Sequence, residues 1–450
     1  MKKKLLLLLF LINATIQSQT FVKGTMSPEI SDLEYVILYQ LKGAKQLYVT
    51  NVDINNGEFK IDFPENSPKG MYRLVYDMNN GGFVDVLFTN ESIELKFDPT
   101  FPSGTLQFLS SEENIVYANY KIQTDNLKQK LDSLQLACFR LKDDSTAFKF
   151  TSEYYKKTRQ NYRETQTKFE ENSKNMLVNN FIKASNKYYA PEVFSSPQLY
   201  LNSEKMHYFD TVDFENTVLQ NSIFYTEKIV DYVFYLNQSD EVEVQNKLYI
   251  NAINEVVDKI DENFALKSEI LTTLMYNFSQ LENSKLIDYI IENFYNKLPL
   301  EYQNLSDIEQ IQNSVKFAIG KMAPDFSWEE NGSEKSLYKI DNAATYIVVF
   351  WSTTCSHCLV EVPELYEFIK DNDKVHVIAV ALENDELGFN HYSEKFEKWT
   401  NVLGLEKWQN SIARAYEISS TPSYFVLDSN KKIISKPYAL EDVKEYIEKH

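Results

Sequence analysis

Cysteine is scarce in this sequence, with three in 450 residues. So few cannot form the dense disulfide framework that stabilises small secreted domains. Cys355 and Cys358 are nevertheless separated by only two residues, whereas Cys138 lies far from both in the sequence. The close pair therefore serves a local purpose: a structural bridge, half of a metal site, or a redox pair.

Glycine and proline are nearly missing from the middle of the chain. No glycine occurs between Gly104 and Gly320, and that interval contains only three prolines. Because turns between strands use these residues and long helices avoid them, we expect residues 111–318 to be helical. Apolar residues at three- and four-residue steps form two stripes typical of buried helix faces: Leu127, Leu131, Leu134, Cys138 and Leu141, and Leu271, Leu274, Met275, Phe278 and Leu281. Cys138 is interpreted as a small core residue of the first stripe.

Basic residues are fewer than acidic residues in this sequence. The chain has 46 lysines and arginines against 65 acidic residues, which gives a formal net charge of -19. A chain this acidic repels phosphate backbones, so nucleic-acid binding is not expected. One basic cluster in the helical region is interpreted as a solvated helix face; it comprises Lys156, Lys157, Arg159 and Arg163.

Long apolar runs are absent except at the start of the chain. Three lysines precede the apolar run from Leu5 to Ile12, and polar residues and the small Ser18 follow it. This is the pattern of a secretory signal peptide, expected at residues 1–19, and the run is too short to span a bilayer. We expect a mature protein that is soluble, exported to the periplasm or cell envelope, and not membrane-spanning. In such a compartment a nearby cysteine pair can persist as a disulfide.

Residues 20–110 show the alternation of a β region. Apolar and charged residues alternate at 58–63 and again at 93–97, as in half-buried antiparallel strands. Asn56-Gly57 is a hairpin turn signal. A small antiparallel β-sandwich is the expected result.

From about residue 319 the pattern changes again. Buried strands are expected at 346–351 and 375–382, with a helix beginning near Cys355 between them. A further helix, a hairpin around Ser429-Asn430 and a closing amphipathic helix follow. This order predicts an α/β domain whose sheet has helices on both faces.

The cysteine pair lies at the expected start of the first of these helices. A spacing of three places both thiols on one face, near disulfide range. A bridge that closes so short a loop adds little stability, which argues against a structural role. At a helix N-terminus, unpaired N–H groups and the helix dipole favour thiolate over thiol. Cys355 is therefore the candidate nucleophile, and the better buried Cys358 is the candidate resolving thiol.

Two further interpretations concern the surroundings of the pair. His357 would stabilise the Cys355 thiolate and make the disulfide more oxidising, or it is an exposed loop residue with little effect. A zinc site needs four ligands, and no second cysteine pair supplies them. We expect no cofactor and no resident metal, although transient copper or haem handling through the dithiol stays open.

The C-terminal residues, about 320–450, resemble the thioredoxin fold, in particular the TlpA/ResA-like exported thiol-disulfide oxidoreductases. The resemblance rests on "MAPDFSW" at 322–328, on "VVFWSTTCSHC" with Trp351 before the cysteines, on Pro363 after them, and on "EISSTPSYFVLD". It implies a thioredoxin-like domain over residues 319–450. It also implies that Cys355 and Cys358 cycle between dithiol and disulfide.

The same resemblance assigns further residues to the site. Glu361 matches the acidic residue that these proteins keep near the active site. Thr421-Pro422 matches their cis-proline segment, in which the Thr421 backbone would pair with an incoming polypeptide. Val349 departs from the pattern, because thioredoxins have a buried aspartate there; proton transfer then falls to Glu361 or water.

The sequence therefore predicts a multidomain protein, with a β-sandwich at 20–110, an all-α region at 111–318 and a thioredoxin-like domain at 319–450. Residues 20–110 also resemble the small β domain that often precedes TlpA-like modules. The predicted enzyme is an exported thiol-disulfide oxidoreductase, acting reductively on protein or peptide clients and exchanging electrons with a redox partner protein. The alternative is an envelope binding or assembly protein whose β and helical regions bind a partner, with an auxiliary or vestigial redox module.

Overall fold

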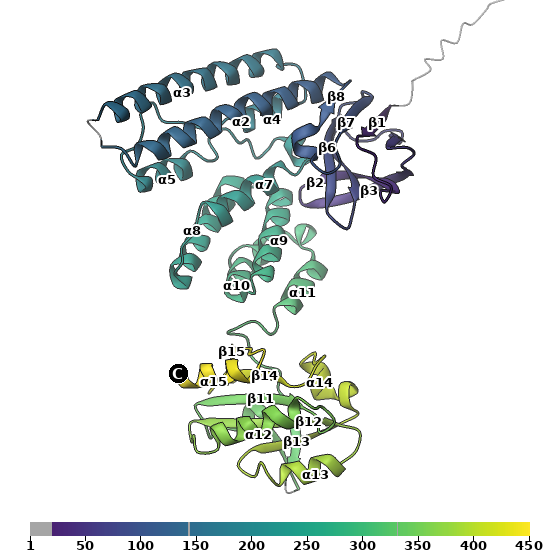
Figure 1. Ribbon diagram of the computed structural model, residues 1–450, viewed down its shortest axis with the longest axis vertical. Helices are drawn as coiled ribbons and strands as arrows, with labels where there is room; N and C mark the ends of the chain where they lie inside the picture. Colours follow the sequence, from purple (N-terminus) through teal and green to yellow (C-terminus); the bar gives the residue numbers. More distant parts are fainter. Residues whose placement is uncertain (1–19, 143–144, 331) are drawn as a thin grey trace, which may run out of the picture. The chain divides into compact units, whose positions relative to one another are not determined.

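The computed structural model describes residues 20–142, 145–330 and 332–450 (Figure 1). The expected signal peptide at residues 1–19 lies outside the described residues. The chain divides into two compact units, Met1–Ile270 and Leu271–His450. In the described part, none of the helices combines the length and the apolar character that crossing a membrane requires.

The first unit begins with strands, as predicted. They are β1 (Phe21–Met26), β2 (Tyr35–Lys42), β3 (Lys45–Asp53), β4 (Glu58–Asp62), β5 (Gly70–Asp77), β6 (Gly82–Phe88), β7 (Ile93–Phe97) and β8 (Gln107–Phe108). Among the described residues they form one sheet in the order β4-β1-β7-β8 and another in the order β3-β2-β5-β6. Side chains alternate between buried and exposed along β4 and β7, and apolar side chains of both sheets belong to one buried cluster.

The Asn56-Gly57 signal identifies a turn but not a hairpin between paired strands. Both residues have positive φ, 53° and 72°, and Asn55 exchanges backbone hydrogen bonds with Glu58 across them. Beyond this single bridge, β3 pairs with β2, whereas β4 pairs with β1 in the other sheet. The predicted turn is confirmed, but antiparallel pairing across it is limited to this one bridge, and the turn carries the chain from one sheet to the other.

The predicted helical region is confirmed. Its helices, after the short α1 (Pro102–Thr105), are α2 (Glu112–Cys138), α3 (Thr146–Asn172), α4 (Asn179–Ala184), α5 (Pro197–Met206), α6 (Thr217–Gln220), α7 (Phe224–Val230), α8 (Val242–Ile260), α9 (Phe264–Gln280), α10 (Ser284–Asn293) and α11 (Leu305–Ser314). The long helices α2 and α3 lie side by side and antiparallel (Figure 1), since residues from both pack into one cluster with Leu131, Tyr155 and Tyr162.

Most of the predicted apolar stripes are buried. Leu131 and Cys138 are 0% and 3% exposed, and the second stripe is buried from Leu271 to Phe278. Leu281, the last residue assigned to that stripe, is 57% exposed because it lies beyond the end of α9.

An asparagine joins the helical region to the edge of a sheet. β6 is an edge strand, and Asn114 of α2 binds the backbone of Leu87 with both polar atoms of its amide. Its Oδ1 accepts from the Leu87 N–H at 2.8 Å, and its Nδ2 donates to the Leu87 carbonyl at 2.7 Å. Asn114 is 3% exposed, so water does not compete for these groups.

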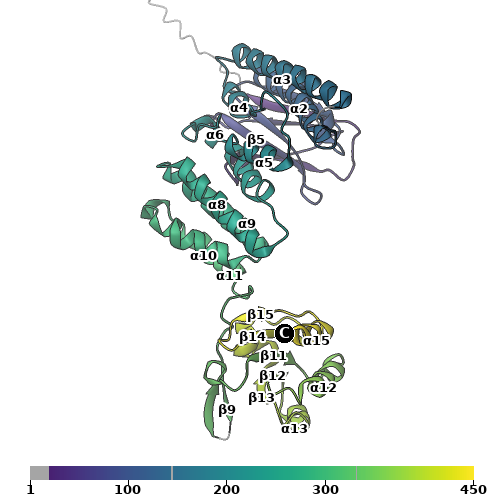
Figure 2. The same cartoon turned by 90° about the vertical axis from the view of Figure 1, so that its left-hand side faces the viewer.

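Among the described residues of the second unit, five strands form a mixed sheet and two form a separate hairpin. The strands are β9 (Ser327–Glu330), β10 (Ser333–Ser336), β11 (Thr345–Trp351), β12 (Val375–Glu383), β13 (Thr400–Leu405), β14 (Ser423–Asp428) and β15 (Ile433–Ser435). The order is β13-β12-β11-β14-β15, with β11, β12 and β13 parallel and β14 antiparallel to β11. The β9–β10 hairpin lies beside this sheet (Figure 2).

Helices cover both faces of this sheet, as predicted. α12 (Cys358–Ile369) and α15 (Leu440–Lys449) pack on the face that carries Ile347, Val349 and Trp351. α14 (Ser411–Ala415) covers the face with Val348 and Phe350. α13 (Leu387–Ser393) follows β12. The buried sheet holds the ends of β11 and β14 rigidly, and the candidate site lies there.

We predict that Asn114→Ala destabilises the first unit by about 1–3 kcal/mol, because it leaves the buried Leu87 N–H and carbonyl unpaired. The measurement is hydrogen exchange at the Leu87 amide, which should become faster. Asn79→Ala, in the exposed β5–β6 turn, is the matched control and should leave that exchange unchanged. Unaltered exchange in Asn114→Ala would contradict this account of the edge strand.

Candidate functional site

The loop between β11 and α12 carries the cysteine pair. The helix begins at Cys358, one turn later than the expected start near Cys355. Cys355 still belongs to the helix entry, since its carbonyl accepts a hydrogen bond from the Leu359 N–H at 3.2 Å. Pro363 lies inside α12.

The two thiols are close to each other but differ in exposure. Both are free thiols in this structure. Cys358 is completely buried, whereas Cys355 is partly exposed. The Cys358 backbone N–H donates to Cys355 Sγ at 3.2 Å. An attacking partner can therefore approach Cys355 directly, while Cys358 lies behind it.

This difference separates the pKa values of the two thiols. Burial alone would raise the pKa of Cys355, but hydrogen bonds from the Cys358 thiol and from the Cys358 and His357 backbone N–H groups outweigh it and lower the pKa below the ordinary cysteine value. Burial, reinforced by the hydrogen bond with Cys355, raises the pKa of Cys358 to about 12. The arrangement favours a thiolate at Cys355 and a protonated thiol at Cys358.

The proline loop lies against the exposed thiol. The Thr421-Pro422 peptide bond is cis, as the sequence resemblance implied. The Thr421 carbonyl is 3.3 Å from Cys355 Sγ, although 66 residues separate the two. Both Thr421 and Pro422 are half-buried, so the loop forms part of the rim around the sulfur.

Glu361 and Tyr424 form a pair next to the buried thiol. Tyr424 on β14 is opposite Val349 in the sheet, and its hydroxyl donates to Glu361 Oε2 at 2.9 Å. Burial, with the hydrogen bond to Glu361 and the nearby Cys358 sulfur, raises the pKa of Tyr424, so this hydroxyl stays protonated. A carboxylate thus lies near the cysteines, although Val349, where the sequence resemblance implied a missing aspartate, is fully buried.

The side chain of His357 is not part of this arrangement. Its side chain is exposed, and no side-chain hydrogen bond or ion pair involves it within the described residues. The structure thus favours the alternative of an exposed loop histidine.

Two residues that the sequence did not single out hold the loop before Cys355. Glu383, 4% exposed at the end of β12, accepts a hydrogen bond from the Thr353 N–H at 2.5 Å. Lys407 Nζ donates to Thr354 Oγ1 at 3.0 Å. The sequence signal that could have pointed to Glu383 is a charged residue at the end of an apolar strand. No sequence signal pointed to Lys407.

The structure therefore brings together Cys355, Cys358, Thr421, Pro422 and Glu361, and leaves the side chain of His357 outside. Within the described ranges, no group of three or more His, Cys, Asp or Glu side chains is arranged to hold a metal ion.

Comparisons with known proteins match this part of the chain. The family model described as Redoxin matches residues 318–446. This C-terminal domain is a redoxin domain. The match confirms the predicted thioredoxin-fold domain.

The redoxin domain is similar to named oxidoreductases. The thiol-disulfide oxidoreductase ResA of Geobacillus thermodenitrificans is 29% identical over 137 residues, which cover 29% of this chain and 77% of the relative. The thioredoxin-like protein YneN of Bacillus subtilis is 28% identical over 121 residues, 26% of this chain and 69% of the relative. A solved domain of a possible thiol-disulfide isomerase from Cytophaga hutchinsonii is 30% identical, with 29% of this chain and 91% of that chain covered and a TM-score of 0.26. The predicted enzyme class, a thiol-disulfide oxidoreductase, is confirmed.

We predict that alkylation by iodoacetamide modifies Cys355 selectively, and that its rate rises with pH around a midpoint below the ordinary cysteine pKa. The reason is that only the thiolate reacts, and hydrogen bonds favour that form at Cys355. Mass spectrometry of quenched samples gives the rate at each cysteine. Cys138 is the internal control, since burial raises its pKa, and it should stay unmodified in the folded protein. Equal rates at Cys355 and Cys358 would contradict the prediction.

Proposed function

We propose that this protein is an exported thiol-disulfide oxidoreductase that reduces disulfides of protein or peptide clients through Cys355 and Cys358. The observation that carries the proposal is the asymmetry of the two thiols: an accessible sulfur with a lowered pKa in front of a buried thiol with a raised one.

In the first step, the Cys355 thiolate attacks one sulfur of the client disulfide. A bond forms between Cys355 Sγ and that sulfur, the client S–S bond breaks, and the leaving client thiolate takes up a proton. The Thr421 backbone, beside the attacked sulfur, holds the client segment in strand fashion.

In the second step, Cys358 loses its proton and attacks Cys355 Sγ. The mixed disulfide breaks, the second client sulfur leaves as a thiol, and the Cys355–Cys358 disulfide remains. Because the pKa of Cys358 is high, this step needs a base, and Glu361, oriented by Tyr424, is the carboxylate near it. A partner protein with a reactive dithiol then returns two electrons to the pair.

The reductive direction is supported by the position of His357. In the part of the chain that the structure describes, its exposed side chain makes no hydrogen bond or ion pair that would stabilise the Cys355 thiolate and so make the disulfide more oxidising. The lysine-led apolar start of the sequence supports export to the periplasm or cell envelope.

A binding role for the first unit is our second proposal. The shared buried cluster of the two N-terminal sheets supports the predicted β-sandwich at 20–110. A cavity in the helical region, at 111–318, supports ligand or partner binding apart from the thiol chemistry.

We expect Cys358→Ala to accumulate a mixed disulfide between Cys355 and a disulfide-containing client such as insulin, because the resolving step is blocked. Non-reducing gels and mass spectrometry detect it. Cys355→Ala should form no adduct and have no insulin-reducing activity, while Cys138→Ala, which removes the distant buried cysteine, should behave as the wild type. A reduction potential of the Cys355–Cys358 pair above that of glutathione would reverse the proposed direction. An active Cys355→Ala would refute the assignment of the nucleophile.

Glu361→Gln should slow resolution of the mixed disulfide by about 100-fold, because it removes the base for Cys358. Tyr424→Phe, which loses a hydrogen bond to a charged group, should slow the same step by about tenfold. Stopped-flow measurement of client release separates this step from the initial attack, which should be unchanged. Tyr338→Phe is the control, since its hydroxyl bonds the Ala323 carbonyl instead. If the substitutions slowed the initial attack and the resolution equally, Glu361 and Tyr424 would have a structural role instead.

A further inference from the structure

A cavity of about 310 Å³ lies in the first unit, between α3 and the segments before and after α5. It is lined by Arg159, Tyr162, Arg163, Asn186, Lys187, Tyr188, Tyr189, His207, Asp210 and Thr211. Its volume is at the small end of the range for ligand pockets. It is large enough for a small organic molecule and larger than a single inorganic ion needs.

The charges that line this cavity are not balanced. Lys187 Nζ pairs with Asp132 and Glu204, and His207 Nδ1 is 2.6 Å from Asp210 Oδ2. No acidic group pairs with Arg159 or Arg163 within the described residues. Two guanidinium groups that lack an acidic partner among the described residues thus line this cavity, in a chain whose formal net charge is -19.

The two arginines are one helical turn apart on α3 and retain free donors. Arg159 uses Nε to bond the Tyr189 carbonyl at 2.7 Å, which fixes the side chain and leaves its terminal nitrogens available. Arg163 has no hydrogen-bond or ion-pair partner in the described part of the chain. A planar guanidinium binds carboxylate and phosphate oxygens through two parallel hydrogen bonds.

The basic cluster lies on a solvated helix face, as expected, since Lys157 and Arg163 are exposed and Lys156 and Arg159 are half-exposed. Lys156 pairs with Glu153 and Glu192 at the surface, as such a face would. The last two members of the cluster, Arg159 and Arg163, also line the cavity.

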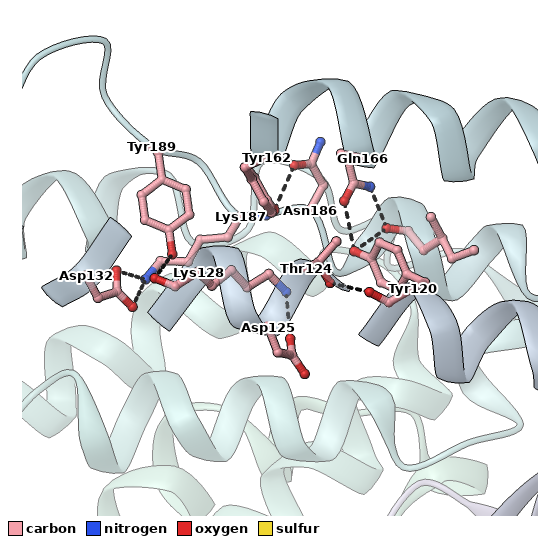
Figure 3. A network of polar contacts seen from close by, with 11 residues as sticks. Tyr120, Thr124, Asp125, Lys128, Asp132, Tyr162, Gln166, Asn186, Lys187 and Tyr189 are labelled. Atoms are coloured by element: carbon pink, nitrogen blue, oxygen red, sulfur yellow. Dashed lines mark hydrogen bonds and ion pairs between the residues drawn. The ribbon is translucent and has the colours of Figure 1, made fainter. Parts of the chain in front are cut away.

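Partly buried hydrogen bonds hold other parts of the cavity wall in place. The Tyr162 hydroxyl accepts from the Lys187 N–H at 2.8 Å and donates to Asn186 Oδ1 at 3.3 Å. Figure 3 shows the Tyr162–Asn186 contact beside a separate hydrogen bond, in which the Tyr120 hydroxyl of α2 donates to Gln166 Oε1 of α3. The contacts of Tyr162 hold the lining residues Asn186 and Lys187 in position before any ligand binds.

Aromatic rings complete the wall. The rings of Tyr188 and His207 stack with centroids 3.8 Å apart, and Tyr188 is 38% exposed. A flat organic body can lie against this pair while its charged group reaches the arginines.

We propose that this cavity binds a small organic anion, whose carboxylate or phosphate is held by Arg159 and Arg163 and whose flat body lies against Tyr188 and His207. The site is independent of the cysteine chemistry and gives the first unit a ligand-binding function of its own.

The test uses benzoate and phenyl phosphate as probes, with benzyl alcohol as their uncharged counterpart, in calorimetric titrations of the full chain. Both anions should bind and benzyl alcohol should not. Arg163→Gln should weaken binding at least about tenfold, because it removes a charge-assisted bidentate contact. Arg163→Lys keeps the positive charge but loses the planar guanidinium group. Its affinity for the two anions should lie between that of Arg163→Gln and that of the wild type.

Arg140→Gln is the matched control, since it removes the same charge from an exposed arginine that does not line the cavity. It should change probe binding less than about twofold, the range expected for distant surface charge. Cys355→Ala, which lacks the proposed nucleophile, should bind the probes with the affinity of the wild type. Loss of the thiol chemistry and loss of anion binding can therefore be told apart. Absence of binding by both anions, or equal binding by wild type and Arg163→Gln, would overturn the proposal.

Discussion

The hydrogen bond from the Cys358 backbone N–H to Cys355 Sγ is the contact on which the chemistry of the C-terminal domain depends. It exists because the chain leaves a buried parallel strand and enters a helix within a few residues, so that backbone donors without helical partners point at one sulfur. The same entry buries Cys358 completely. One local feature of the backbone thus produces two thiols with opposite tendencies to ionise.

The surrounding residues hold this entry in position from several directions. Glu383 fixes the preceding loop from the end of β12, the Thr421 carbonyl contacts the sulfur from the loop before β14, and Tyr424 fixes Glu361. These residues are far apart in the sequence but meet where the central strands of the sheet end. The buried sheet between two layers of helices therefore determines the geometry of the site more than the CSHC segment does.

Much of this domain could be predicted from the sequence, because strands buried on both faces are continuous apolar runs and the cysteine spacing is specific. The unpredicted β13 is different: its strand TNVLGL lies within a polar, charged stretch between residues 382 and 411, which hides its short alternation.

Side-chain contacts were harder to predict. Glu383 and Tyr424 act through partners that only the sheet register brings close. Arg163 is an exposed basic residue of a helix, and no sequence signal showed that it lines a cavity. The Asn56-Gly57 turn is a further example. The turn could be predicted from local residue types, whereas the strand that each flanking strand pairs with is determined by packing in the core.

The complete burial of Cys358 behind Cys355 also has a consequence for oxidative damage. A peroxide reaches the outer sulfur first and converts it to a sulfenic acid. The inner thiol, already in hydrogen-bond contact, condenses with that sulfenic acid, releases water and forms the disulfide. The reaction competes with further oxidation to the irreversible sulfinic acid, so the pair that exchanges electrons with clients also protects its own nucleophile.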